Sequence, residues 1–235
     1  MGTTKMTVRK ANADRKLIDS QLGNISKQIA CDELMLIGIY QSNKPIINLM
    51  TPKEYEEKIK SSWQRINDLL LRREKLNAAV MRVFGGFNNT EEPRVWVEVP
   101  KFEGFDKPMS SIQKITIAQA IARKNYFKTP IMDLINRIQA QARRVSDQYD
   151  KWCEKADKDF KTQINSQFGP ESSQTAKQRI EYADSIRGQY TVNKIDPLNI
   201  AHKTEEIRIQ VLDYINTIDS ILSKATETFE VEIED

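Results

Sequence analysis

Arginine occurs at three positions where the sequence pattern predicts an apolar side chain. In several segments apolar residues recur at alternating spacings of three and four, the pattern of a helix that packs along one face. Arg15, Arg73 and Arg208 each occupy one of these positions. Arginine binds phosphate through a planar fork of donors, so the three side chains are candidates for a site that holds a small anion.

The same three arginines also fit a purely structural role. An unpaired buried charge costs several kcal/mol, so a buried guanidinium must have a partner. Internal ion pairs would provide one, for example with Glu74 or Asp19. Alternatively, the aliphatic stems pack while the charged ends reach water. The sequence leaves the anion site and the internal pairs open as alternatives.

A second candidate site lies in the stretch 123–128, Arg-Lys-Asn-Tyr-Phe-Lys. Its cations, Arg123 and Lys124, could hold phosphates while Tyr126 stacks on a base. The alternative is a solvated basic face with Tyr126 and Phe127 in the core. Both candidate sites favour a nucleotide-like anion as the ligand.

The residue types needed for other chemistry are scarce. The chain has one histidine, His202, and two distant cysteines, Cys31 and Cys153. They exclude a zinc finger, a CxxC redox pair and a disulfide framework. No Walker loop, GxGxxG or GxSxG motif is present. We therefore expect a protein that is not an enzyme and uses no metal and no cofactor.

Charge is distributed unevenly along a nearly neutral chain. The net charge of the 235 residues is +3, but residues 1–150 carry +8 and residues 151–235 carry −5. Positive charge is concentrated in 60–82 and 114–144. Local basic segments suit a small anion better than long duplex DNA, so nucleic acid is not the expected partner. No apolar run reaches about 18 residues and no secretory signal is evident, so we expect no membrane span and a cytoplasmic protein.

Glycine and proline mark the element boundaries. Each occurs 8 times, and together they make up about half of their usual share, which favours long helices over turn-rich folds. Thr51-Pro52-Lys53-Glu54 is a helix start with a capping box. The sequence predicts a single, mainly α domain of long antiparallel coiled-coil-like helices with a small antiparallel β-hairpin. The predicted elements are a helical hairpin of 7–30 and 52–84, a β-hairpin at 94–116, a long helix at 117–168 that Pro130 kinks or breaks, a helix at 197–226 and a terminal strand at 228–233.

Three segments resemble the septicolysin-like (Dip-thirteen-like) bacterial proteins and related short phage proteins. They are 69–80 (LLLRREKLNAAV), 115–125 (ITIAQAIARKN) and the stretch from 192–198 (VNKIDPL) through the last helix. The resemblance implies a compact helical protein, often phage-associated, that acts by binding. The chain departs from that family in its longer N-terminal helix, its 100–114 loop and its polar 157–180 segment.

Three functions follow as hypotheses. The first is a non-catalytic homo-oligomer that sequesters a small anionic, nucleotide-like signalling ligand, as a phage protein would to silence a host defence, in the cytoplasm of a bacterial host. The second is a coiled-coil assembly or virion protein whose partners are proteins. The third is a non-specific nucleic-acid binder. The long apolar stripes favour a homo-oligomer, because an uncovered stripe would face water.

Overall fold

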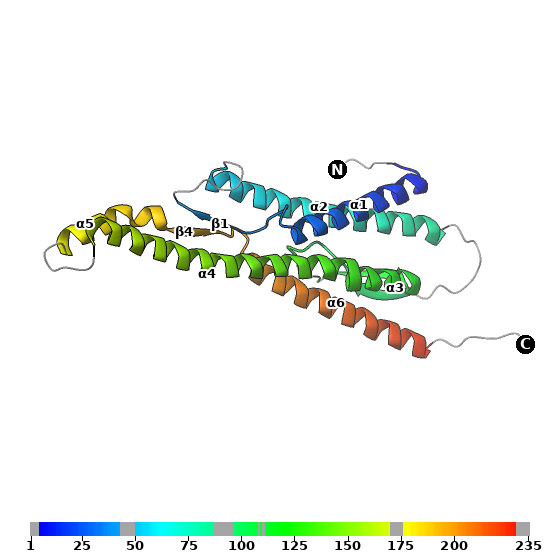
Figure 1. Cartoon of the computed structure of the whole chain (residues 1–235). Coiled ribbons are helices and arrows are strands. Elements are labelled where there is room, and N and C mark those ends of the chain that lie inside the picture. Colours follow the sequence, from blue (N-terminus) through cyan, green and yellow to red (C-terminus); the bar gives the residue numbers. More distant parts are fainter. Residues whose placement is uncertain are drawn as a thin grey trace, which may run out of the picture.

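The structure is a computed structural model that describes residues 5–42, 50–86, 96–107, 109, 111–169 and 176–228. The mainly helical fold with a small β-hairpin is confirmed, and the molecule is elongated (Figure 1). The helices are α1 (Val8–Ala30), α2 (Pro52–Gly86), α3 (Ile117–Tyr126), α4 (Met132–Phe168), α5 (Ala176–Arg187) and α6 (Ile200–Thr228). The strands are β1 (Gly38–Gln41), β2 (Trp96–Pro100), β3 (Ile112–Thr116) and β4 (Val192–Ile195).

Helices α1 and α2 pack side by side in opposite directions. Arg15 near the start of α1 donates to Asn77 near the end of α2, while Asp19, one turn later in α1, accepts from Arg73, one turn earlier in α2. The start of α2 has the predicted capping box: the Thr51 hydroxyl accepts from the Glu54 N–H, and the Glu54 carboxylate accepts from the Thr51 N–H. This capping holds the pKa of Glu54 below its usual value.

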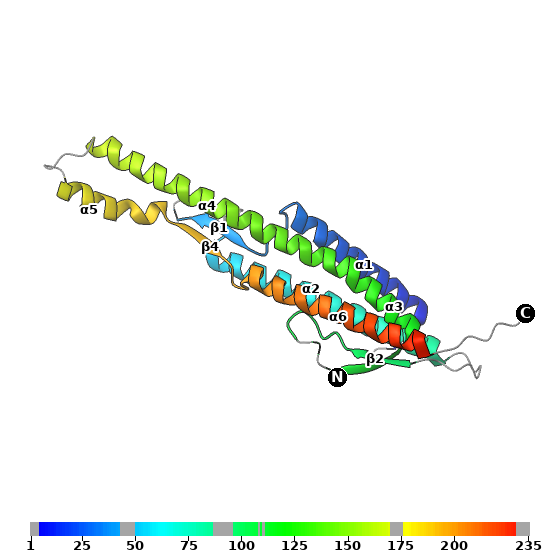
Figure 2. The same cartoon turned by 90° about the horizontal axis from the view of Figure 1, so that it is seen from below.

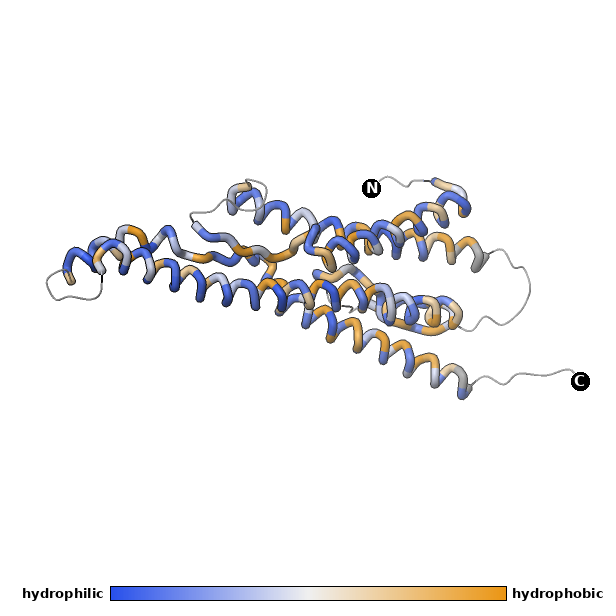
Figure 3. The backbone as a smooth tube through the Cα atoms, viewed as in Figure 1, coloured by the Kyte–Doolittle hydropathy of each residue, from blue (hydrophilic) through white to orange (hydrophobic). Residues whose placement is uncertain are grey.

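One apolar core joins these two helices to α3, α4 and α6. Its largest fully buried side chains come from several helices and the start of β1, and they include Ile29, Leu36, Ile66, Phe127, Ile135 and Ile218. Hydrophobic colour is concentrated where α1, α2, α3 and α6 meet (Figure 3). Phe127 lies at the centre of this region, with its ring 4.7 Å from that of Tyr214 and 5.0 Å from that of Phe102, centroid to centroid.

Pro130 lies in a π-helical turn, η2 (Phe127–Ile131), between α3 and α4. Proline has no N–H and its ring crowds the carbonyl four residues back, so an ordinary α-helical turn is strained there. The wider turn relieves this strain, and the Met132 N–H donates to the Phe127 carbonyl five residues earlier. The chain thus stays helical from Ile117 to Phe168.

The two sheets are separate two-stranded antiparallel ribbons. β2 pairs with β3 in the region of the predicted hairpin, with Trp96 opposite Thr116 and Pro100 opposite Ile112. β1 pairs with β4, although the two strands lie about 150 residues apart in the chain. This pairing was not among the predicted elements.

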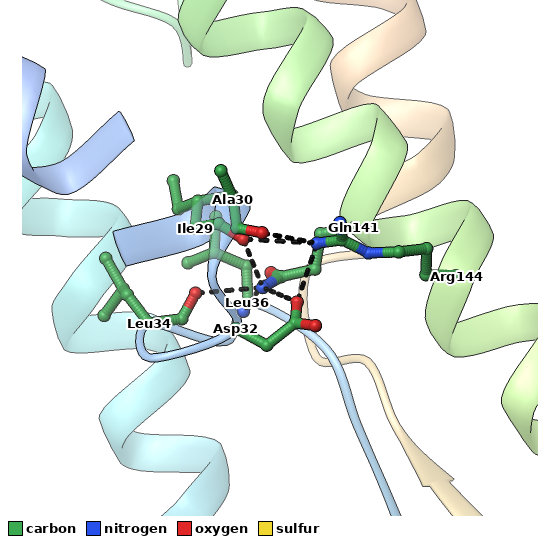
Figure 4. Close-up of polar contacts among 7 residues, drawn as sticks. All are labelled: Ile29, Ala30, Asp32, Leu34, Leu36, Gln141 and Arg144. Atoms are coloured by element: carbon green, nitrogen blue, oxygen red, sulfur yellow. Dashed lines mark hydrogen bonds and ion pairs between the residues drawn. The ribbon is translucent and has the colours of Figure 1, made fainter. Parts of the chain in front are cut away.

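The turn after α1 is held by two side chains of α4 (Figure 4). Fully buried Gln141 accepts from the Leu36 N–H at 3.0 Å and donates to the Leu34 carbonyl at 3.1 Å. Arg144 donates to Asp32, whose φ of 59° lies in the left-handed region. Arg144 also donates to the Ala30 carbonyl at the end of α1, and together these contacts fix the approach to β1.

The C-terminal part of α4 and the following α5 form an arm that extends beyond the other helices (Figures 1 and 2). α4 ends at Phe168, where the predicted helix 117–168 ends, and the polar 157–180 segment also contains the start of α5 at Ala176, a helix that was not among the predicted elements. The last helix starts at Ile200 rather than 197, because the Asp196 carboxylate caps the Ile200 N–H. The predicted terminal strand lies beyond Thr228 and falls outside the described residues.

Candidate anion-binding site

Helix α2 buries a second row of side chains besides the row that faces α1. Its members are Trp63, Asn67, Leu70 and Glu74, spaced by four, three and four. The loop after β2 is anchored to this row. Asn67 accepts from the Phe105 N–H at 2.9 Å and donates to Asp106 at 2.9 Å, while Trp63 donates to Asp106 at 3.1 Å.

Two further features hold the same loop in place. Gly104 has φ of +102°, a conformation that favours glycine, and it lies against Asn67. From α6, Lys203 forms an ion pair with Asp106 at 2.5 Å and places its ammonium 4.8 Å from the Trp63 ring centroid. The loop is therefore fixed to both α2 and α6.

Glu74 lies at the centre of a mostly buried cluster of charges. Its carboxylate pairs with Arg123 of α3 through one oxygen and with Arg73, at 3.4 Å, through the other. Arg73 also donates to Asp19 at 2.6 Å, and its guanidinium carbon lies 3.2 Å from the centroid of the Tyr126 ring. The internal pairs that the sequence offered as the alternative for Arg73 are therefore formed.

Arg123 is the cluster member with unused hydrogen-bonding capacity. Its side chain is only 6% exposed, and neither Nε nor Nη1 has a hydrogen-bond partner among the described residues. Burial alone would lower the pKa of Arg123, but the Glu74 carboxylate and the Tyr214 phenol outweigh it, so the pKa is raised and the group stays charged. The Tyr214 hydroxyl, also buried, lacks hydrogen-bond geometry with any described residue.

Burial affects the tyrosines around the cluster in the same direction. It raises the pKa of Tyr126 and of Tyr214 well above the usual value for a phenol. Both side chains therefore remain neutral through the physiological range. They supply rings to the cluster, and neither is poised to exchange a proton near neutral pH.

A cavity of about 550 Å³ opens beside Glu74 and Arg123, between α2, the loop after β2, β3 and α3. This volume is in the range of small-molecule sites. One wall is apolar and consists of Leu71, Ala78, Ala79 and Phe102. The positive groups that line the cavity are Lys75, Lys101, Lys107 and Arg123.

The structure brings only part of the predicted site together. Arg73, Arg123 and Tyr126 share the cluster at the cavity's edge, and Arg123 lines the cavity itself. Arg15 donates to Asn77 at 2.8 Å in the α1–α2 contact. The two remaining residues do not line the cavity: Lys124 pairs with Asp219 of α6, and Arg208 forms an exposed pair with Glu205 at 3.1 Å.

Sequence reasoning missed most of the cavity's cations. Lys75 belonged to a basic stretch without being singled out, and Lys101 and Lys107 lie in a loop that was treated only as a connection. The available signal was the second row on α2. A Trp, Asn, Leu and Glu at helical spacing, each one residue after a position of the predicted contact face, indicates that a further element packs beside that face.

Among the residues that the structure describes, no group of three or more His, Cys, Asp or Glu side chains could hold a metal ion. Nor is any described helix long and apolar enough to cross a membrane.

In comparisons with known proteins, neither a family model, nor a curated protein, nor a solved structure matches the chain.

Proposed function

We propose that this protein is a non-catalytic binding protein that sequesters a small anionic, nucleotide-like ligand in the cavity between α2 and α3. The observation that carries the proposal is the combination of an apolar wall with convergent positive groups in one hollow of suitable volume. Buried Arg123 lines that hollow, and two of its nitrogens have no hydrogen-bond partner among the described residues.

The biological context of this proposed function comes from the sequence. The resemblance to septicolysin-like and phage proteins supports a binding role. A phage-encoded homo-oligomer that removes a signalling nucleotide in the cytoplasm of a bacterial host would serve as an anti-defence sponge. Such a role needs affinity and abundance but no reaction, which agrees with the absence of catalytic motifs from the sequence.

The test begins with the purified protein. We expect an absorbance ratio at 260 and 280 nm above that of the polypeptide, and release of a phosphate-bearing compound on denaturation, identified by mass spectrometry. Calorimetry with nucleoside phosphates, cyclic nucleotides and ADP-ribose nucleotides then measures rebinding. A protein that carries no compound and gives no heat with any of these ligands would contradict the proposal.

An assembly role is the second candidate, and the β2–β3 ribbon favours it. Trp96 and Ile112 are 53% and 71% exposed, and both lie on the ribbon's outer face with the Glu98–Lys114 pair between them. Large apolar side chains that share an exposed face often mark a protein contact. Light scattering of the wild type and of the Trp96→Ser, Ile112→Ser double variant tests this role. Stable multimers that the double variant loses, in a protein with no ligand affinity, would favour assembly over sequestration.

A further inference from the structure

The charged groups that line the cavity do not balance. Its cations are Lys75, Lys101, Lys107 and Arg123, and its carboxylates are Glu74 and Glu103. Glu103 pairs with Lys101 at 3.0 Å and Glu74 pairs with Arg123, so these four charges cancel. Within the described part of the chain, no carboxylate lies within 4 Å of the remaining two ammonium groups, those of Lys75 and Lys107. The lining therefore has an excess of two positive charges.

The two pairs that cancel are also fixed in position. The Glu103 carboxylate accepts from both Lys101 and the Ser111 hydroxyl, and these contacts hold its pKa below the usual value. Glu74 is 8% exposed and is held by two arginines. Lys107 also acts on Glu103 through its charge, but two carboxylates balance only two of the four cations, so the excess charge is available to a ligand.

On the basis of the function proposed above, we infer that the ligand is an organic phosphomonoester of about the size of a nucleoside monophosphate. A phosphomonoester carries about −1.5 to −2 charges at pH 7, which matches the excess, whereas a diester carries only one. Its phosphate lies between Lys75 and Lys107. Its ring lies against the apolar wall of Leu71, Ala78 and Phe102.

Arg123 lines the same cavity and supports this placement of the ligand's phosphate and ring. It is more than nine-tenths buried, it lines the cavity, and two of its nitrogens have no acceptor among the described residues. Carbonyl or hydroxyl oxygens on a ligand's ring or sugar would act as acceptors for these nitrogens after a small shift of the Arg123 side chain. A purely apolar ligand would leave these N–H groups unpaired, so the cavity favours a polar ring system over a lipid chain.

The experiment is calorimetry at pH 8 with the common ribonucleoside 5′-monophosphates, the matching nucleosides, the 3′,5′-cyclic monoesters of charge −1 and inorganic phosphate. We expect one 5′-monophosphate to bind at least about tenfold more tightly than its nucleoside and its cyclic form. Because the second phosphate pKa is about 6, affinity should fall when the pH is lowered from 8 to 5. The 5′-sulfate analogue, with a single charge, should bind weakly at both pH values.

Single-residue variants test whether the ligand binds in this cavity. Lys75→Gln and Lys107→Gln should each weaken binding by about tenfold, while Lys58→Gln, an exposed lysine of α2 away from the cavity, should not change it. All three lysines are exposed, so thermal unfolding should match the wild type and exclude misfolding as the cause.

The outcomes separate this inference from the function on which it rests. If a cyclic or dinucleotide ligand binds as tightly as the monophosphates and the lysine variants weaken it, the sequestration proposal stands and the phosphomonoester inference fails. If monophosphates bind equally well to the lysine variants, the site assignment fails. If no anion in either panel binds, both proposals fail.

Discussion

Two buried polar side chains, Gln141 and Arg123, differ in how completely their hydrogen bonds are used. The amide of Gln141 accepts from one backbone N–H and donates to backbone carbonyls on the same turn (Figure 4). Arg123 makes one bond to Glu74 and leaves two nitrogens unpaired. The hydrogen bonds of Gln141 are thus made within the fold, whereas Arg123 has two nitrogens without a hydrogen-bond partner among the described residues.

Replacing Gln141 by leucine should destabilise the protein. The change keeps the volume but leaves the Leu36 N–H and the Leu34 carbonyl without their partner in the core, at a cost of about 1–3 kcal/mol for each group. Urea unfolding measures the loss. Gln148→Leu, on an exposed position of the same helix, is the matched control and should stay within about 0.5 kcal/mol of the wild type.

Ionisation of Tyr55 makes the stability of the fold depend on pH in the alkaline range. Burial raises its pKa to about 12 from 10, so the folded protein resists an ionisation that the unfolded chain undergoes. The contribution of Tyr55 is complete below pH 10 and is lost as pH rises from 10 to 12. In Tyr55→Phe, whose ring cannot ionise, the loss of unfolding free energy between pH 9 and 11 should be smaller by about 1 kcal/mol.

The control for that variant is its behaviour near neutral pH. The Tyr55 hydroxyl is buried without a hydrogen-bond partner among the described residues, so removing it should leave stability at pH 7 unchanged or raise it. Equal alkaline slopes for the two proteins in urea titrations at pH 9, 10 and 11 would show that Tyr55 ionises normally.

The outcome for the candidate residues shows what residue patterns can predict. For Arg73 the suggested partners Asp19 and Glu74 are those observed, whereas Arg208 forms an exposed pair with Glu205. The relation of Arg123 to the cavity depends on a loop far along the chain that packs on α2, and spacing within one helix carries no information about that loop. The cavity itself was therefore not predictable from the sequence.

At the scale of elements, the predicted helices agree with the structure wherever one apolar face decides the packing. The hairpin of α1 and α2 and the β2–β3 ribbon lie within a few residues of the predicted ranges. Helix α2 buries two faces, and only the row facing α1 was recognised. Pairing of β1 with β4 also escaped the sequence, because short strands are specified by their distant partners rather than by local propensity.

Two glycines test how tightly the elements pack. A Cβ on Gly38 of β1 would lie 2.3 Å from the Tyr55 ring, so Gly38→Ala should destabilise by about 1–3 kcal/mol. A Cβ on Gly23, in the interior of α1, meets nothing within 4 Å, so Gly23→Ala should stabilise by about 0.5–1 kcal/mol. Thermal unfolding should shift in opposite directions for the two variants. A Gly38→Ala variant as stable as the wild type would mean that β1 is not seated on Tyr55.

At the scale of the whole molecule, the body and the arm differ in how they are held together. The core joins five helices in the body, whereas α5 buries none of its residues fully. Aromatic pairs such as Phe168–Tyr182, with ring centroids 5.4 Å apart, connect α5 to α4. The arm is also more hydrophilic in colour than the centre of the body (Figure 3).

The rates of amide hydrogen exchange should therefore differ between the arm and the body. We expect amides of α5 to exchange at least about a hundredfold faster than those in the middle of α1 and α2, because local opening of α5 exposes little apolar surface. Mass spectrometry of peptic peptides covering 176–187 and 11–29 measures the contrast. Equal protection of the two regions would show that α5 is covered, for instance by a second copy of the chain.

The π-helical turn around Pro130 also determines how α4 is rotated about its axis relative to α3. Each residue advances an α-helix by about 100°, and the π pattern holds one residue more per turn than an ordinary one. Removing one residue from 127–131 would turn the buried stripe of α4 about 100° away from the core while leaving that of α3 in place. The extra residue therefore works as an angular spacer: it lets Arg123 face Glu74 while Leu134 and Ile138 still face the core.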